Sequence, residues 1–155
     1  MTDHIARSLT LAAEAGANGN RPFGAVLTAA TGAVLAEGHN EVASSGDVTA
    51  HAELVAIRAA TAAGLAAQLP GSVMYASGEP CPMCAAACVW AGIARIVFAA
   101  STAGFSAVLP DGPHFLLGCA ALIEHTDATV EVCGPVREQE ALAAMRAATS
   151  PVCPR

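Results

Sequence analysis

One histidine and two cysteines in this sequence have the residue types and the spacing of metal ligands. His51 lies in the segment Thr49-Ala50-His51-Ala52-Glu53, and Cys81 and Cys84 lie in Glu79-Pro80-Cys81-Pro82-Met83-Cys84. An imidazole and two thiolates suit a tetrahedral zinc ion. Three protein ligands leave the fourth position for water, as in catalytic zinc sites. We therefore predict that the chain binds one Zn²⁺ through His51, Cys81 and Cys84.

Glu53, two residues after His51, is the predicted proton carrier of this site. Zinc lowers the pKa of a bound water to about 7, so hydroxide is available at neutral pH. Attack on an amidine-like ring carbon also requires that the water loses a proton, a ring nitrogen gains one and the amine leaves as ammonia. A carboxylate beside the metal can carry these protons. Taken alone, Glu53 would be an ordinary first-turn carboxylate that the helix dipole favours.

Both motifs fall where a loop enters a predicted helix. Pro82 suits the first position of a helix, which makes Cys81 the expected N-cap. A helix N-terminus carries a partial positive charge that stabilises thiolates and a carboxylate. Two such helix starts brought together would form a compact pocket for these groups. The role of Glu79 stays open between a brace of the second motif and a helper in proton transfer.

The hydrophobic periodicity and the turn residues predict an alternation of helices and strands. We expect helices over 3–17, 50–63, 82–91, 113–124 and 137–148, and strands over 23–29, 32–38, 72–76, 93–99 and 129–133. The segment 100–127 is long enough for a helical crossover, so the last two strands should be parallel. This order predicts a three-layer α/β/α sandwich with a mixed five-stranded sheet. Without a repeat, linker or charge block, residues 1–155 are interpreted as one domain.

The charge distribution points to a small, weakly charged substrate and away from nucleic acid. The formal net charge is −6, and all seven basic residues are arginines. They are scattered singly at positions 7, 21, 58, 95, 137, 146 and 155. A polynucleotide binder needs clustered cations to displace counterions from phosphates. A phosphorylated substrate is also disfavoured, because nothing obvious would neutralise the phosphate.

The apolar composition favours a cytoplasmic protein that associates with itself rather than with a membrane. The most apolar run, 81–94, is shorter than the roughly 20 residues that a bilayer requires. The start of the chain carries Asp3 and His4 instead of a secretory signal. Hydrophobic residues make up 54% of the chain and charged residues 13%, so we expect a homodimer that covers an apolar face.

The remaining cysteines are interpreted as buried free thiols. These are Cys88, Cys119, Cys133 and Cys153, which are dispersed among apolar residues. The alternative is a structural site in which Cys88, one helical turn after Cys84, supplies a fourth zinc ligand. The small apolar neighbours of Cys88 favour the free thiol.

The paired motifs resemble those of the cytidine-deaminase-like superfamily. His51-Ala52-Glu53 followed by Pro80-Cys81-Pro82-Met83-Cys84 matches the His-x-Glu … Pro-Cys-x-x-Cys pattern of zinc deaminases. The flanking sequence is similar to the branch that holds bacterial guanine deaminases, yeast-type cytosine deaminases and transfer-RNA adenosine deaminases. The similar flanking segments are Pro22–Val26, His39–Glu41 and Ala103–Phe105. The resemblance covers about residues 1–105.

The resemblance implies a role for each matching residue. His51, Cys81 and Cys84 would bind zinc, and Glu53 would move protons. The backbone N–H of Ala52 would bind a substrate carbonyl, Asn40 would hydrogen-bond the ring and Phe23 would stack on it. The resemblance also implies a dimer, in which the C-terminal segment sometimes closes the site of the partner. Without the resemblance, Asn40 would be a turn residue at a strand end and Phe23 a core residue.

The substrate stays open among several aminated rings. The sequence departs from guanine deaminases where Ser106-Ala107 follows Phe105 in place of an acid, and the tail from Ser150 has no aromatic residue. A free base is expected, with guanine first, followed by cytosine, a modified purine or a triazine. A transfer-RNA adenosine deaminase is the second reading, and a zinc-stabilised interaction module without activity is the third.

Overall fold

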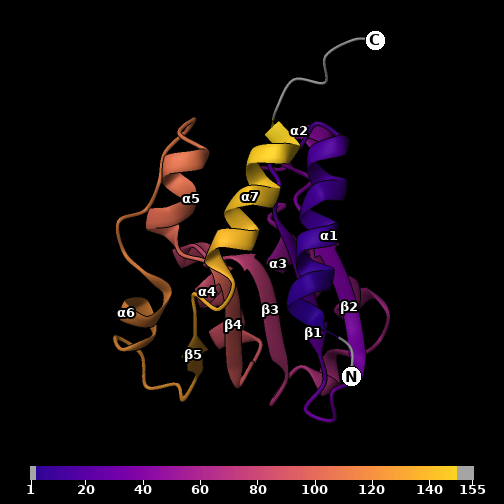
Figure 1. Cartoon of the computed structure of the whole chain (residues 1–155). Helices are drawn as coiled ribbons and strands as arrows, with labels where there is room; N and C mark the ends of the chain where they lie inside the picture. The colour runs from indigo at the N-terminus through magenta and orange to yellow at the C-terminus, as the bar shows by residue number, and fades with distance from the viewer. Residues whose placement is uncertain (1–2, 150–155) are drawn as a thin grey trace.

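The computed structural model describes residues 3–149 and is built on one mixed sheet. Figure 1 shows the five strands in the order β2-β1-β3-β4-β5. Their bounds are Gly24–Thr28 for β1, Val34–His39 for β2, Val73–Gly78 for β3, Arg95–Ala100 for β4 and Glu131–Cys133 for β5. Strand β1 is antiparallel to β2 and β3, whereas β3, β4 and β5 run parallel. The predicted mixed sheet with its last two strands parallel is confirmed.

Helices cover both faces of this sheet, which confirms the predicted three layers (Figure 1). α1 (His4–Ala17) and α7 (Glu138–Thr149) pack on one face, and α3 (Ala52–Ala62) and α4 (Pro82–Trp90) on the other. The short helices α5 (Thr102–Val108) and α6 (Cys119–Ile123) lie on the side of β4 and β5. A four-residue helix α2 (Val42–Ser45) follows β2, and a 3₁₀ turn (Ala66–Gln68) follows α3.

The core has two parts because the sheet separates the two helical layers. β1 is buried along its whole length, as expected for a strand between two neighbours and two helix layers. On one face Ile5 and Leu9 of α1 pack with Leu142 and Met145 of α7. On the other face the small residues of α3 and α4 pack against β1 and β3.

Two glycines allow the helices to approach the strands closely. A Cβ atom at Gly38 would lie 2.3 Å from the carbonyl oxygen of Ala52, and one at Gly24 would lie 2.3 Å from that of Ser8. Neither distance is compatible with a side chain, so α3 rests directly on β2 and α1 directly on β1. The contact at Gly38 fixes the beginning of α3 relative to the end of β2.

The predicted helix over 113–124 is wrong for its first half. Helix occurs only from Cys119 to Ile123, after Gly118 as the N-cap. The apolar residues before it form an irregular segment in which Leu116 is fully exposed. Phe115, Leu116 and Leu117 are all exposed, so these apolar residues do not form the buried face on which a helix prediction relies. Helix α5 was missed inside the same crossover; it begins at the Ser101 N-cap, whose side chain accepts a hydrogen bond from Gly104.

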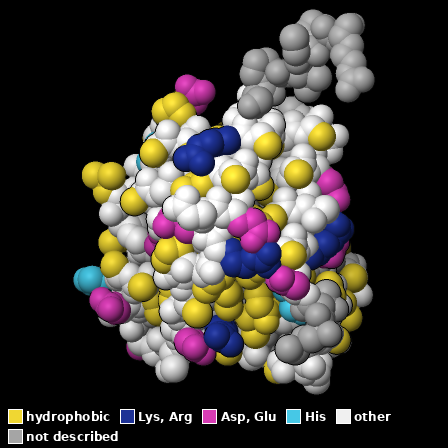
Figure 2. Space-filling model, viewed as in Figure 1, with side chains coloured by type: hydrophobic (Ala, Val, Ile, Leu, Met, Phe, Trp, Pro, Cys, Tyr) yellow, Lys and Arg dark blue, Asp and Glu magenta, His cyan; other side chains and the backbone are white. Residues whose placement is uncertain are grey.

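Among residues 3–149, no helix combines the length and the apolar character that a membrane crossing demands. On the face drawn in Figure 2, the arginine side chains lie apart from one another, with acidic side chains close by. Cys153, Arg155 and the rest of the tail from Ser150 lie outside the described residues, so the expectations for them are not tested.

Candidate active site

The functional residues gather at one edge of the sheet because of the strand directions. Phe23 precedes β1, Asn40 follows β2, Glu79 follows β3 and Ser101 follows β4. Since β1 runs opposite to β2 and β3, its beginning lies beside their ends. β4 is parallel to β3 and ends at the same edge. The helices that start here, α3 and α4, therefore bring their N-termini to a common place.

His51, Cys81 and Cys84 form a metal site between these two helix starts. His51 is the N-cap of α3 and Cys81 is the N-cap of α4, with Pro82 at the first helical position as predicted. The Nδ1 atom of His51 lies 3.6 Å from the Sγ atoms of both cysteines. A tetrahedral zinc ion with Zn–N of about 2.05 Å and Zn–S of about 2.3 Å separates nitrogen and sulfur by about 3.6 Å. The geometry therefore fits zinc.

Cys88 does not complete this ligand set. The three ligand atoms lie within 4.8 Å of one another, and Cys88 does not belong to that group. Its thiol is fully buried, and burial raises its pKa well above the usual range. Cys88 is therefore a core thiol, and the structure favours three ligands over the alternative of a four-ligand structural site.

The two cysteine ligands share a proton that a metal ion can displace. The Cys84 thiol, together with His51, holds the pKa of Cys81 at about 4. The same interaction, with burial, raises the pKa of Cys84. One sulfur is thus a thiolate at neutral pH, and the other retains its proton until a metal competes for it.

Glu53 is a buried carboxyl group in the wall of the same site. Its exposed fraction is only 7%, and it lines the pocket next to His51. Burial is the main cause that raises the pKa of Glu53 above its usual value, and the negative charge of Cys81 acts in the same direction. A carboxyl group with a raised pKa inside a cleft is suited to proton transfer.

The pocket has a volume of about 510 Å³, which is ample for one small ring compound. One wall comes from the metal site and the strand ends, and a second wall comes from α5 and the segment before α6. The lining residues of the second wall are Thr102, Phe105, Pro113, His114, Phe115 and Leu117.

The other predicted contact residues lie around this pocket. Asn40 is 3% exposed, its Oδ1 accepts a hydrogen bond from the Val42 N–H, and its own N–H donates to the Phe23 carbonyl. Asn40 and Phe23 both line the pocket. Ala52 is the first residue of α3, where a backbone N–H has no acceptor within the helix. The Phe23 ring meets the Phe105 ring edge-on, with centroids 5.1 Å apart.

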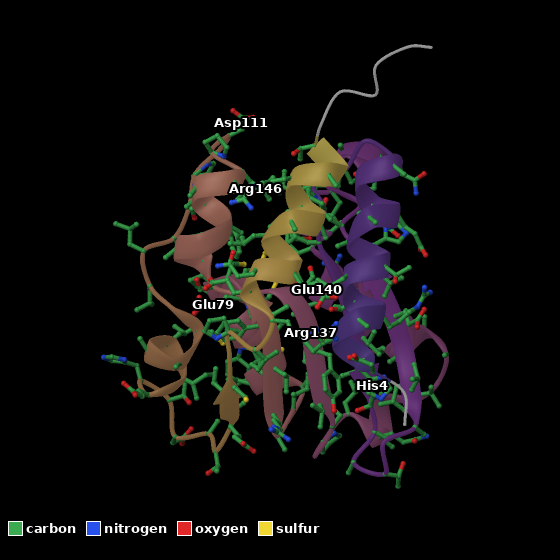
Figure 3. The ribbon with its side chains drawn as sticks, in the orientation of Figure 1. His4, Glu79, Asp111, Arg137, Glu140 and Arg146 are labelled. Atoms are coloured by element: carbon green, nitrogen blue, oxygen red, sulfur yellow. The ribbon has the colours of Figure 1, made fainter. Side chains whose placement is uncertain are left out.

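Glu79 is a bracing residue whose role the sequence left open. One carboxylate oxygen accepts a hydrogen bond from the Thr102 N–H at 2.9 Å, and the other accepts from the Cys119 N–H at 2.8 Å. Figure 3 shows Glu79 between α5 and α6, whose first turns carry these two N–H groups. Both carboxylate oxygens thus hold the second wall of the pocket. The sequence feature that could have indicated this role is the position of Glu79 directly before Pro80-Cys81.

Comparison with known proteins supports the assignment of a zinc site. Residues 2–100 match the cytidine and deoxycytidylate deaminase zinc-binding region. The chain belongs to this family and carries its His/Cys/Cys zinc site.

Individual relatives differ in their substrates. Guanine deaminase of Bacillus subtilis (strain 168) is 48% identical over 99 residues, which are 62% of this chain and 62% of that protein. A tRNA-specific adenosine deaminase of Agrobacterium fabrum is 41% identical over 99 residues, 64% of each chain. The matched segments span less than two thirds of the length of these relatives. A solved structure in complex with 2,6-diaminopurine superposes with a TM-score of 0.81 at 27% identity, covering 98% of this chain and 84% of that one.

We expect the purified protein to contain about one zinc ion per chain, held by one nitrogen and two sulfur atoms. Elemental analysis and X-ray absorption spectroscopy measure both quantities. Replacing Cys84 by Ala should remove most of the zinc, because one of only three protein ligands is lost. The matched control Cys133→Ala, in β5, should retain it. A protein without zinc, or with four sulfur ligands, contradicts the assignment.

Proposed function

We propose that this protein is a zinc-dependent deaminase that hydrolytically removes the exocyclic amino group of a free nucleobase or a related aminoheterocycle, with guanine as the first candidate. The observation that carries this proposal is the meeting of three metal ligands and the buried Glu53 carboxyl group at one pocket wall. The likeness to the Bacillus guanine deaminase and to a structure that binds 2,6-diaminopurine supports a purine.

Glu53 is the proton carrier in this proposal. A zinc ion held by His51, Cys81 and Cys84 would lower the pKa of a bound water to about 7 and so supply the nucleophile. Glu53 accepts the proton that this water loses and donates it to the ring nitrogen beside the carbon under attack. It then delivers the second water proton to the amino group, which leaves as ammonia. Water and the C–NH₂ group are thereby converted into C=O and NH₃.

The polar groups at the strand ends orient the ring. The N–H of Ala52 at the start of α3 donates a hydrogen bond to a ring carbonyl, and the helix dipole favours the charge that this oxygen gains. The Oδ1 atom of Asn40 is engaged by Val42, which leaves the amide N–H groups for the substrate. Phe23 and Phe105 supply the apolar surface for the ring.

A transfer-RNA adenosine deaminase is the second candidate, because a relative of that kind is 41% identical. The charges favour the free base. Four arginines are engaged with carboxylates, in the pairs Arg7–Glu37, Arg58–Asp47, Arg95–Glu131 and Arg137–Asp3. Charges neutralised in this way contribute little to phosphate binding along a polynucleotide.

We further propose that the protein works in the cytoplasm. The five cysteines within residues 3–149 are free thiols. Free thiols persist in reducing compartments, whereas secreted proteins commonly form disulfides.

A comparison of substrates tests the proposed function. Guanine should give the highest kcat/KM among guanine, cytosine, adenosine, their nucleotides and transfer RNA. It carries the ring carbonyl and amidine groups that the pocket requires, and the similar Bacillus protein is a guanine deaminase. Ammonia release under steady-state conditions measures this. If a nucleotide or transfer RNA leads, the free-base proposal is wrong. If cytosine or a triazine leads, only guanine is replaced.

Replacing Glu53 by Gln should lower kcat by about 10²–10⁴-fold, because the amide keeps the shape but cannot carry a proton. Zinc content and the circular dichroism spectrum should not change. Glu124→Gln, on the exposed end of α6, is the matched control and should retain full activity. A Glu53→Gln variant that loses less than about tenfold identifies another group as the proton carrier.

We also propose that a second copy of the chain covers the rim of the pocket. The exposed apolar residues include Val48, Trp90, Phe115, Leu116 and Leu117. Three of them, Val48, Phe115 and Leu117, line the pocket as well, so one apolar surface joins the rim to the interior.

Light scattering at micromolar concentration should therefore give a mass at least twice that of one chain. Leu116→Glu should shift the protein toward the monomer, because it places a charge on the apolar rim. Val34→Glu, at the beginning of β2 and at the opposite edge of the sheet, should leave the mass unchanged. A wild-type protein that is monomeric under these conditions overturns the proposal.

A further inference from the structure

Arg21 is a pocket residue that neither motif includes. It precedes β1 and lines the pocket together with Phe23. Its guanidinium lies over the Phe23 ring, 5.6 Å from the ring centroid. One Nη2–H group donates a long hydrogen bond of 3.4 Å to the carbonyl oxygen of Leu109, at the end of α5. The guanidinium is thereby held between the metal-site wall and the second wall.

The surroundings of Arg21 differ from those of the four arginines that pair with carboxylates. No carboxylate of residues 3–149 lies within 4.0 Å of Arg21, although Asp111, labelled in Figure 3 beyond α5, acts on it at longer range. Partial burial lowers the pKa of Arg21, and Asp111 opposes this effect. Arg21 lines the same pocket as the metal ligands His51 and Cys81.

Arg21 is an exposed residue, so its remaining N–H groups can exchange water for an acceptor on a ligand. A guanidinium has five N–H donors and no acceptor, and Arg21 uses one of them weakly. Glu79, a carboxylate that lines the same pocket, is already engaged by two backbone N–H groups. A ligand that presents an oxygen atom to Arg21 gains charge-assisted hydrogen bonds. A ligand that presents an amino group places one hydrogen-bond donor against another and gains none.

We propose that Arg21 determines substrate specificity by donating hydrogen bonds to an oxygen of the substrate, either a carbonyl on the aminated ring or a phosphate oxygen carried by a substituent of that ring. The inference rests on the proposed function and adds the class of substrate. It also revises the sequence expectation that nothing would neutralise a phosphate. A carbonyl oxygen has two lone pairs, so it can accept from the Ala52 N–H and from Arg21 together.

The test uses three ligands that separate the two sources of oxygen. Guanine carries a ring carbonyl where 2,6-diaminopurine carries an amino group. Guanosine monophosphate adds a phosphate to guanine. Equilibrium dialysis measures their dissociation constants in zinc-loaded Glu53→Gln protein, in which turnover is suppressed. Arg21→Gln and Arg21→Lys are added to this background. Arg95→Gln, at the opposite end of β4 and paired with Glu131, is the matched control.

Arg21→Gln should reduce the preference for guanine over 2,6-diaminopurine, or for guanosine monophosphate over guanine, by about 10- to 100-fold, the value of a hydrogen bond to a charged group. A smaller preference for guanine over 2,6-diaminopurine identifies a ring carbonyl as the acceptor of the Arg21 hydrogen bonds. A smaller preference for guanosine monophosphate over guanine identifies a phosphate as the acceptor. Arg21→Lys should retain part of the preference, because the ammonium is also a donor without an acceptor. Arg95→Gln should change neither ratio.

Unchanged ratios overturn the inference, whether the three affinities stay as they were or all weaken equally. Equal weakening indicates that Arg21 only positions the loop. The deaminase proposal is judged separately by ammonia release from the wild-type protein. If no base releases ammonia while the binding ratios change as expected, the deaminase proposal fails and the specificity assignment to Arg21 stands.

Discussion

The convergence of two helix N-termini is the constraint on which the rest of the site depends. α3 and α4 pack on the same face of the sheet and begin at the same edge, with His51 and Cys81 as their N-caps. Unsatisfied N–H groups at these ends stabilise negative charge, which a thiolate and a nearby carboxyl group both require. The close contact of α3 with Gly38 fixes the height of its first turn above the strands. A displaced α3 would separate the histidine from the cysteines and carry Glu53 away with it.

Two carboxylates attach the rest of the chain to this centre. Glu79 holds the first turns of α5 and α6, as described above. Glu138 of α7 accepts hydrogen bonds from the backbone N–H and the hydroxyl of Ser101, at the end of β4. The Ser101 hydroxyl in turn caps α5 by accepting from the Gly104 N–H. The second wall therefore has a defined position although it contains only short helices.

The sequence predicted those parts of the site that depend on local chemistry. His51, Glu53, Cys81 and Cys84 occur in two short motifs, and Pro82 indicated where a helix begins. The mixed sheet with its last two strands parallel followed from the alternation of elements and the length of the crossover. Contacts that form only in three dimensions were not predictable: Arg21 occurs in no motif, and its neighbour in space, Leu109, is far away in the sequence. The error over 113–124 has the same origin, since an apolar pattern does not reveal whether a surface exists for it to cover.

The two walls of the pocket have separate origins in the chain. The ligands, Glu53 and Asn40 come from the segment 2–100 that matches the family, whereas Thr102, Phe105 and the segment 113–117 follow it. The second wall is joined to the first largely through backbone N–H groups, which every residue type except proline provides. Side chains on that wall can therefore be exchanged without breaking the attachment or moving the metal ligands. This arrangement allows proteins with this fold to change which ring they bind during evolution while the metal ligands and Glu53 stay the same.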